Sequence, residues 1–175
     1  MQHQPNPTSK EASMAKPTDH RSPKTDHHKP RSKYSVPVFP HVKKFILKNY
    51  CNPEPVKVEE YTTIGKMVTL ALRDNRKHAE FNDQYRDRLT ATISIHLTTE
   101  QSKMGPRLGK LMRLNIHIDG IFKEHMLTWI SALKTDGIPA YTACKMFLDY
   151  YQLDENEYGL NTAYKYYQRA KGIKN

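Results

Sequence analysis

The chain contains few cysteines and no long apolar run. Only Cys51 and Cys144 are present, 93 residues apart, so neither a disulfide framework nor a Cys-x-x-Cys zinc site is predicted. No stretch reaches the about 18 apolar residues that a membrane-spanning helix needs, and no apolar segment follows residues 1–5 as a secretory signal requires. These absences predict a soluble cytoplasmic protein with no membrane partner, in which both cysteines are small buried side chains.

Sequence motifs of the common enzyme classes are also missing. There is no Gly-x-x-x-x-Gly-Lys phosphate loop, no Gly-x-Gly-x-x-Gly and no Gly-x-Ser-x-Gly. The nine histidines do not have metal-ligand spacing, so the chain is expected to be non-catalytic, with no cofactor, metal or small-molecule substrate. A nuclease stays open, because carboxylate sites assemble only in the fold. Its candidate carboxylates are Asp74, Glu80, Asp83, Asp87 and Asp119.

Basic residues are in large excess. Lysine and arginine number 28 against 18 aspartates and glutamates, which gives a net charge of +10 and a pI near 9.5. An excess of this size favours a polyanionic partner, because lysine and arginine release counterions when they bind phosphates. Charge alone leaves DNA, RNA and anionic lipid open.

Residues 1–34 differ in composition from the rest of the chain. They hold five prolines, seven Lys or Arg and three Asp or Glu, with almost no large aliphatic residue. Such a segment cannot offset the entropy of ordering, so it is predicted to be a disordered arm of net charge +4. The composition fits a phosphate-seeking arm and a solubilising leader equally well.

Residues 35–175 are predicted to form a single helix-rich domain, mainly α with a minor β component (α+β). Apolar residues at helical spacing recur along most of this region. The expected helices cover about 40–50, 62–72, 108–114, 119–135, 139–151 and 160–171, with a weak stretch at 115–120. Strands are expected at 56–58 and 89–97.

The strand at 89–97 supports two interpretations. Its aliphatic residues alternate with Thr, Ser and His. Together with the helical segments behind it, residues 89–134 resemble the ribbon-helix-helix family, whose paired strands enter the major groove of DNA as a homodimer. The chain departs from that family at Gly105-Pro106 and in the lack of Lys or Arg on the strand's outer face. A half-buried strand in a mixed sheet explains the same alternation.

Residues 138–172 have the pattern of a helix-turn-helix module, with two short helices on either side of a polar connection. On the second helix Leu160, Tyr164 and Tyr167 form an inward stripe. The rest of this helix carries side chains that contact base edges and phosphates in a major groove. The predicted nucleic-acid-binding residues are Asn161, Lys165, Tyr166, Gln168, Arg169, Lys171 and Lys174. A solvated face, with basic residues favoured by the helix dipole, explains the pattern without a ligand.

Tyrosines are concentrated in the same region. Tyr150, Tyr158 and Tyr166 lie off the inward stripes and are expected to be exposed, where they could stack on unpaired bases. This feature keeps RNA open as the nucleic acid.

Two segments resemble small uncharacterised proteins of phages and mobile elements. They are Phe-Pro-His-Val-Lys-Lys-Phe at 39–45 and Ala-Tyr-Lys-Tyr-Tyr-Gln-Arg at 163–169. The resemblance carries no defined activity and favours a role in DNA transactions. Taken together, the sequence predicts a non-catalytic nucleic-acid-binding accessory or regulatory protein, with duplex DNA favoured over RNA. A structural or assembly component that uses its charge against DNA or an acidic protein is the alternative.

Overall fold

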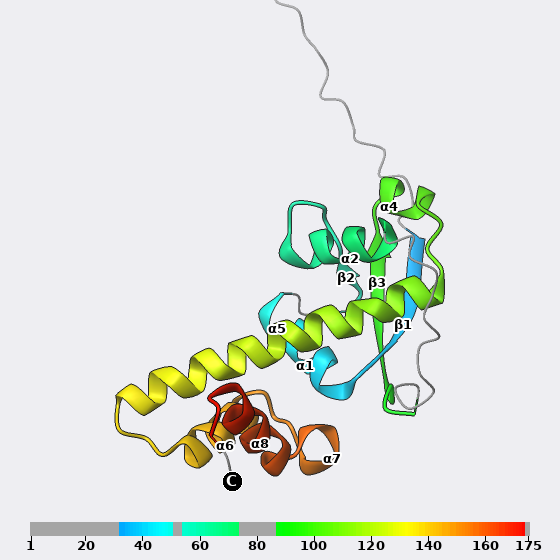
Figure 1. Ribbon diagram of the computed structural model, residues 1–175. Helices are drawn as coiled ribbons and strands as arrows, with labels where there is room; N and C mark the ends of the chain where they lie inside the picture. The colour runs from blue at the N-terminus through cyan, green and yellow to red at the C-terminus, as the bar shows by residue number, and fades with distance from the viewer. Residues whose placement is uncertain (1–31, 51–53, 74–86, 174–175) are drawn as a thin grey trace, which may run out of the picture.

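The computed structural model describes residues 32–50, 54–73 and 87–173. The protein is mainly helical with a small three-stranded sheet, which confirms the predicted fold class. In chain order the described elements are β1 (Ser32–Val38), α1 (Pro40–Asn49), β2 (Val56–Lys57), α2 (Thr63–Arg73), β3 (Ala91–Leu97), α4 (Thr99–Lys103), α5 (Leu108–Thr135), α6 (Ala140–Tyr150), α7 (Glu155–Tyr158) and α8 (Leu160–Ala170). Helix α5 crosses the molecule from the sheet to the C-terminal helices (Figure 1).

The sheet has the order β1-β3-β2 and is mixed. Strand β1 runs antiparallel to β3 along its whole length, and β2 pairs with β3 in parallel. Pro37 lies in the edge strand β1, where a residue without an N–H is tolerated. Because β3 is the central strand, it is not the free ribbon that a ribbon-helix-helix dimer requires. The mixed-sheet interpretation is therefore confirmed.

The two faces of the sheet differ in burial. The two isoleucines and the leucine of β3 are buried against the helices, whereas Thr92 is exposed and Ser94 and His96 are half-buried on the other face. Strand β3 begins at Ala91, two residues after its predicted start. Strand β1 begins at Ser32, so the predicted arm ends inside a strand, and its residues 1–31 lie outside the described residues.

Helix α5 is continuous over 28 residues, which corrects the expected break at 115–120. Two of the polar residues there, Asn115 and Asp119, are buried and half-buried and pair with the N-terminal segment, whereas His117 is exposed. Asn115 is fully buried; its side chain accepts a hydrogen bond of 3.1 Å from Phe39 N and donates one of 2.9 Å to Pro37 O. Asp119 contacts His41. Tertiary partners satisfy these groups, so the helix does not end at them.

Two short helices, α4 and α7, were not expected from the sequence. They carry too few apolar residues for a periodic pattern, but each begins with a capping box. Thr98 and Gln101 form the box of α4, and Asp154 and Glu157 form that of α7. Helix α7 occupies the polar connection between the two predicted helices of the C-terminal module.

One aromatic cluster joins α1, α5 and α6. Phe122 of α5 lies 5.6 Å from Phe45 of α1 and 5.4 Å from Phe147 of α6, measured between ring centroids. Tyr151 packs 4.9 Å from Phe147. These rings are all buried, so they fix the C-terminal helices against α1 and α5.

Cys144 is buried in α6, as predicted for a small core residue. Burial raises the pKa of its thiol to about 11, so the thiol stays protonated and unreactive near neutral pH. Cys51 lies outside the described residues.

Candidate nucleic-acid interface

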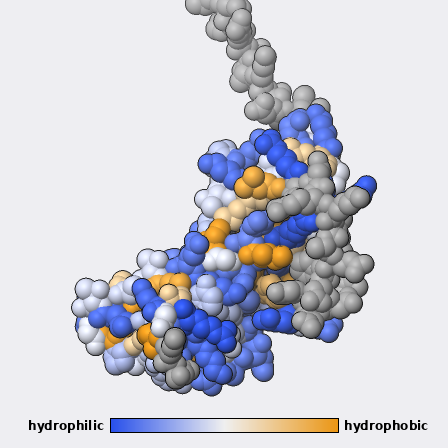
Figure 2. Space-filling model, viewed as in Figure 1, coloured by the Kyte–Doolittle hydropathy of each residue, from blue (hydrophilic) through white to orange (hydrophobic). Residues whose placement is uncertain are grey.

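Helix α8 presents a polar outer face, as the sequence predicts. Asn161, Lys165 and Arg169 are exposed, and Gln168 is half-buried. Tyr167 is buried on the opposite side of the helix together with Ala163. The visible surface over α7 and α8 is mainly hydrophilic (Figure 2). Of the other predicted residues, Lys171 is exposed just past the helix, Tyr166 is half-buried, and Lys174 lies outside the described residues.

Three of the predicted residues meet at a pocket of about 380 Å³: Lys165, Tyr166 and Arg169. Asn161, Gln168 and Lys171 do not line it. The pocket is completed by side chains from distant parts of the sequence, namely Phe39, His41, Arg88, Asp119, Lys123, Tyr158 and Thr162. Four cations and one carboxylate line the pocket, so its formal charge is +3 with histidine counted as neutral.

Asp119 is held by two basic side chains. His41 Nε2 lies 2.9 Å from Asp119 Oδ1, and Lys123 Nζ lies 2.5 Å from Oδ2. Burial alone would raise the pKa of Asp119, but the hydrogen bonds from His41 and Lys123 outweigh it and hold the pKa below its usual value. Because the ionised carboxylate only accepts hydrogen bonds, the Nε2 atom of His41 bears a hydrogen and is the donor of this hydrogen bond.

Arg88, Lys165 and Arg169 have no acidic partner within the described part of the chain. Arg88 lies over the ring of Phe39, 5.5 Å from its centroid, and Lys123 lies 5.4 Å from the centroid of Tyr166. Lys165 and Arg169 are exposed on α8 and form no ion pair with any described residue. The pocket therefore combines positive charge with aromatic walls.

Two buried polar atoms at the pocket lack a hydrogen-bond partner among the described residues. One is the hydroxyl oxygen of Tyr158, whose side chain is 6% exposed, and the other is Nδ1 of His41, at 2%. The two rings pack with centroids 4.9 Å apart. Burial raises the pKa of the Tyr158 hydroxyl well above its usual value, and the charge of Asp119 raises it further. The hydroxyl therefore remains a hydrogen-bond donor at any physiological pH.

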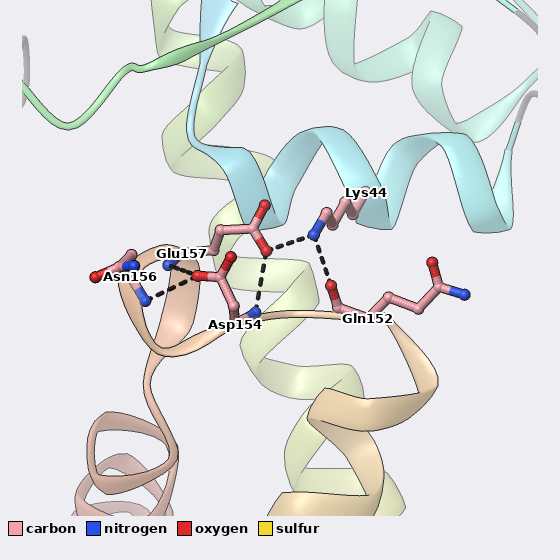
Figure 3. Close-up of polar contacts among 5 residues, drawn as sticks. All are labelled: Lys44, Gln152, Asp154, Asn156 and Glu157. Carbon is pink, nitrogen blue, oxygen red and sulfur yellow. Dashed lines mark hydrogen bonds and ion pairs between the residues drawn. The ribbon is translucent and has the colours of Figure 1, made fainter.

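The position of Tyr158 follows from the anchoring of α7. Lys44 of α1 contacts the Glu157 carboxylate and donates a hydrogen bond of 2.6 Å to the carbonyl oxygen of Gln152 (Figure 3). The Asp154 carboxylate accepts hydrogen bonds from the backbone N–H groups of residues 156 and 157 (Figure 3). Tyr158 ends this anchored turn and points its ring into the protein, which corrects the expectation that it is exposed.

Helix α8 begins immediately after this turn. Its N-cap is Gly159, and the first helical N–H, that of Leu160, donates a hydrogen bond of 3.1 Å to the Glu155 carboxylate. A Cβ atom at residue 159 would stand only 2.3 Å from Glu155 Oε1. The close approach of α7 and α8 at this glycine places Tyr158 and Lys165 on the same pocket.

Most of the pocket residues that lie outside α8 were not predicted from the sequence as part of a binding site. His41 and Asp119 are separated by 78 residues, so only the fold brings them together. A weak signal was present in residues 115–120, where polar residues interrupt an otherwise apolar helix. Asp119 and Lys123 also have the spacing of a helical ion pair.

Within residues 32–50, 54–73 and 87–173, no three His, Cys, Asp or Glu side chains are grouped so that they could hold a metal ion. The same described part of the chain includes no helix long and apolar enough to cross a membrane. Three of the candidate nuclease carboxylates, Asp74, Glu80 and Asp83, lie outside it.

No family model matches this chain, and no curated protein or solved structure is significantly similar to it.

Proposed function

We propose that this chain is a nucleic-acid-binding protein that contacts the phosphate backbone of duplex DNA through α8 and the adjoining pocket. The observation that carries the proposal is the convergence of four cations from three separate segments. Arg88 precedes β3, Lys123 belongs to α5, and Lys165 and Arg169 belong to α8. Cations brought together by folding, with one carboxylate among them, are suited to a polyanion.

Helix α8 also has the shape and side chains needed to enter a major groove. Its 11 residues extend about 16 Å, and its outer face presents Asn161 next to the basic residues. The buried Tyr167 and Ala163 hold the opposite side of the helix on the protein. Phosphate contacts from the pocket would fix the orientation of α8, and its amide side chains would contact the bases. We propose an accessory or regulatory role on this basis.

The test is fluorescence anisotropy of a labelled DNA duplex, titrated with protein at several salt concentrations. The double variant Lys165→Ala/Arg169→Ala should bind roughly tenfold more weakly at low salt, and its log–log salt slope should be smaller by about one per lost phosphate contact. The matched control is Lys66→Ala/Arg73→Ala, which removes one lysine and one arginine from exposed positions of α2. Equal losses in both variants would show that net charge alone matters and would remove α8 from the proposal.

A protein partner is the second candidate, favoured by exposed apolar side chains on two helices that pack together. Leu70 of α2 is 64% exposed and Ile116 of α5 is 54% exposed. An assembly component of this kind would form stable oligomers without nucleic acid, which sedimentation would detect. Structured RNA and single strands, added as competitors at one salt concentration, separate RNA binding from duplex binding.

A further inference from the structure

The pocket beside α8 has features that binding to a continuous phosphate backbone does not require. Contacts to the phosphate backbone come largely from exposed Arg and Lys side chains and do not need an enclosed pocket. Here the cations surround a hollow of about 380 Å³, which falls within the range of pockets that enclose small ligands. Its inner wall is formed by Tyr158 and His41, both more than nine-tenths buried.

The Tyr158 hydroxyl is a buried hydrogen-bond donor on a residue of the pocket wall. It has no hydrogen-bond partner among the described residues. Its electrostatic neighbours include Asp119, Tyr166 and Arg88, which line the same pocket. A buried donor without an acceptor reduces stability, and phenylalanine would fill the same space without that cost. A hydroxyl placed in this way is suited to donate to an acceptor that enters from outside.

We infer that the pocket binds a terminal phosphate group of a nucleotide, with the Tyr158 hydroxyl donating to a phosphate oxygen and Lys165, Arg169 and Arg88 supplying the charge. This inference rests on the proposed nucleic-acid binding and adds the chemical class of the group that occupies the pocket. The nucleoside extends outward past Thr162 and the half-buried ring of Tyr166. The phosphate belongs either to the end of a nucleic-acid strand or to a free mononucleotide.

Charge distinguishes a terminal phosphate from an internal one. A phosphomonoester carries between −1.5 and −2 charges near pH 7, whereas each internal phosphodiester carries one. The formal charge of +3 around the pocket matches the more highly charged group. Asp119 does not oppose it strongly, because both carboxylate oxygens already accept hydrogen bonds, from His41 and from Lys123.

The experiment compares three labelled oligonucleotides of one sequence, with a 5′-phosphate, a 3′-phosphate or no terminal phosphate, by anisotropy with the full chain. One phosphorylated form should bind about tenfold more tightly than the unphosphorylated form, as expected for a hydrogen bond to a charged group. Calorimetric titration with the corresponding mononucleotide determines whether the free nucleotide is enough.

The deciding variant is Tyr158→Phe, which removes only the hydroxyl. It should lose the preference for the phosphorylated strand and keep the affinity for the unphosphorylated one, while its Tm is unchanged or higher because the unpaired hydroxyl is gone. Tyr141→Phe, at an exposed tyrosine of α6, is the matched control and should retain the preference.

The outcomes separate this inference from the proposed function. Equal binding of all three oligonucleotides, or a preference that survives in Tyr158→Phe, overturns the phosphate site and leaves nucleic-acid binding standing. Binding of the mononucleotide alone, lost in Tyr158→Phe, supports the phosphate site and overturns the proposed function. The absence of binding to any oligonucleotide or mononucleotide at low salt overturns both.

Discussion

The imidazole of His41 donates a hydrogen bond of 2.9 Å from Nε2 to the Asp119 carboxylate, although 78 residues separate the two in sequence. His41 lies in the first turn of α1, and Asp119 lies near the middle of α5. The contact therefore joins the segment that follows the edge strand to the helix that supports both parts of the fold. It also forms one wall of the basic pocket.

Acid should weaken the fold through Asp119. Its pKa in the folded protein lies below 3.8, the value of a free side chain, so the folded state favours the ionised form. The resulting stabilisation is present above pH 3.8 and is lost as the pH falls through the folded-state pKa. Between pH 6 and pH 3 the wild-type protein should therefore lose more free energy of unfolding than Asp119→Asn, as measured by urea denaturation.

Glu54 provides the internal reference for this comparison. Its pKa is also lowered: burial acts to raise it, but hydrogen bonds from Lys43 and the backbone of Ser94 outweigh that effect. Both proteins keep this group, so both should lose some stability in acid. Identical pH profiles for the wild type and Asp119→Asn would contradict the assigned role of Asp119.

Removal of the Asn115 side chain should destabilise the protein by about 3 kcal/mol. The substitution Asn115→Ala leaves the N–H of Phe39 and the carbonyl of Pro37 without their partner in a buried place. Each buried backbone group left unsatisfied costs about 1–3 kcal/mol. The neighbouring substitution Ile116→Ala, on the exposed side of the same helix, should change stability by less than about 0.5 kcal/mol. Urea denaturation of both variants measures the difference, and similar losses would contradict this account.

Glycine at residue 152 should stabilise the protein by about 1 kcal/mol. Gln152 has a φ of 55°, the left-handed region that costs about 1–2 kcal/mol for a residue with a Cβ atom. Around it, Leu153 N donates to Leu148 O and Gln152 N donates to Asp149 O, the Schellman pattern that favours glycine. The greater backbone entropy of unfolded glycine offsets part of the gain.

The control for this prediction is Gln152→Ala, which keeps the Cβ atom. Both variants retain the carbonyl oxygen that accepts from Lys44, so they differ only in backbone preference. A midpoint of denaturation for Gln152→Gly no higher than that for Gln152→Ala would show that the left-handed conformation is not the source of strain.

The sequence predicted most elements of the fold because their signals are local. Each of these elements buries one face and exposes the other, so its apolar residues recur with the period of a helix or a strand. This holds for the strand at 89–97 and for the helices at 40–50, 62–72, 139–151 and 160–171. The error at 115–120 has the opposite origin. The polar side chains there bind partners far away in sequence: Asn115 binds the backbone of β1, and Asp119 binds His41. A local pattern does not show such partners, so the polar residues resemble the end of a helix.

The candidate site was predictable only in the part that one helix contributes. The spacing of Lys165 and Arg169 on α8 places them on one face in any fold that buries Tyr167. Arg88, Lys123 and Tyr158 have no such relation in sequence, because their common position depends on how α5, α7 and the start of β3 pack. The prediction that Tyr158 is exposed was wrong for the same reason, because the contact between Lys44 and α7 holds its ring toward the interior.

The length of helix α5 fixes how the sheet and the C-terminal helices are rotated relative to each other about the helix axis. Buried residues recur along it at multiples of four residues, with Leu114 and Ile118 near its start and Met126 and Ile130 near its end, so the buried row winds around the helix from one end to the other. A single residue inserted between them would rotate the rest of the helix by about 100° about its axis. The helix could then keep its packing contacts at one end only by losing those at the other. Insertions that preserve the packing at both ends are therefore expected in steps of seven residues, which is close to two full turns. Such an insertion would increase the distance between the sheet and the C-terminal helices with little rotation of one relative to the other.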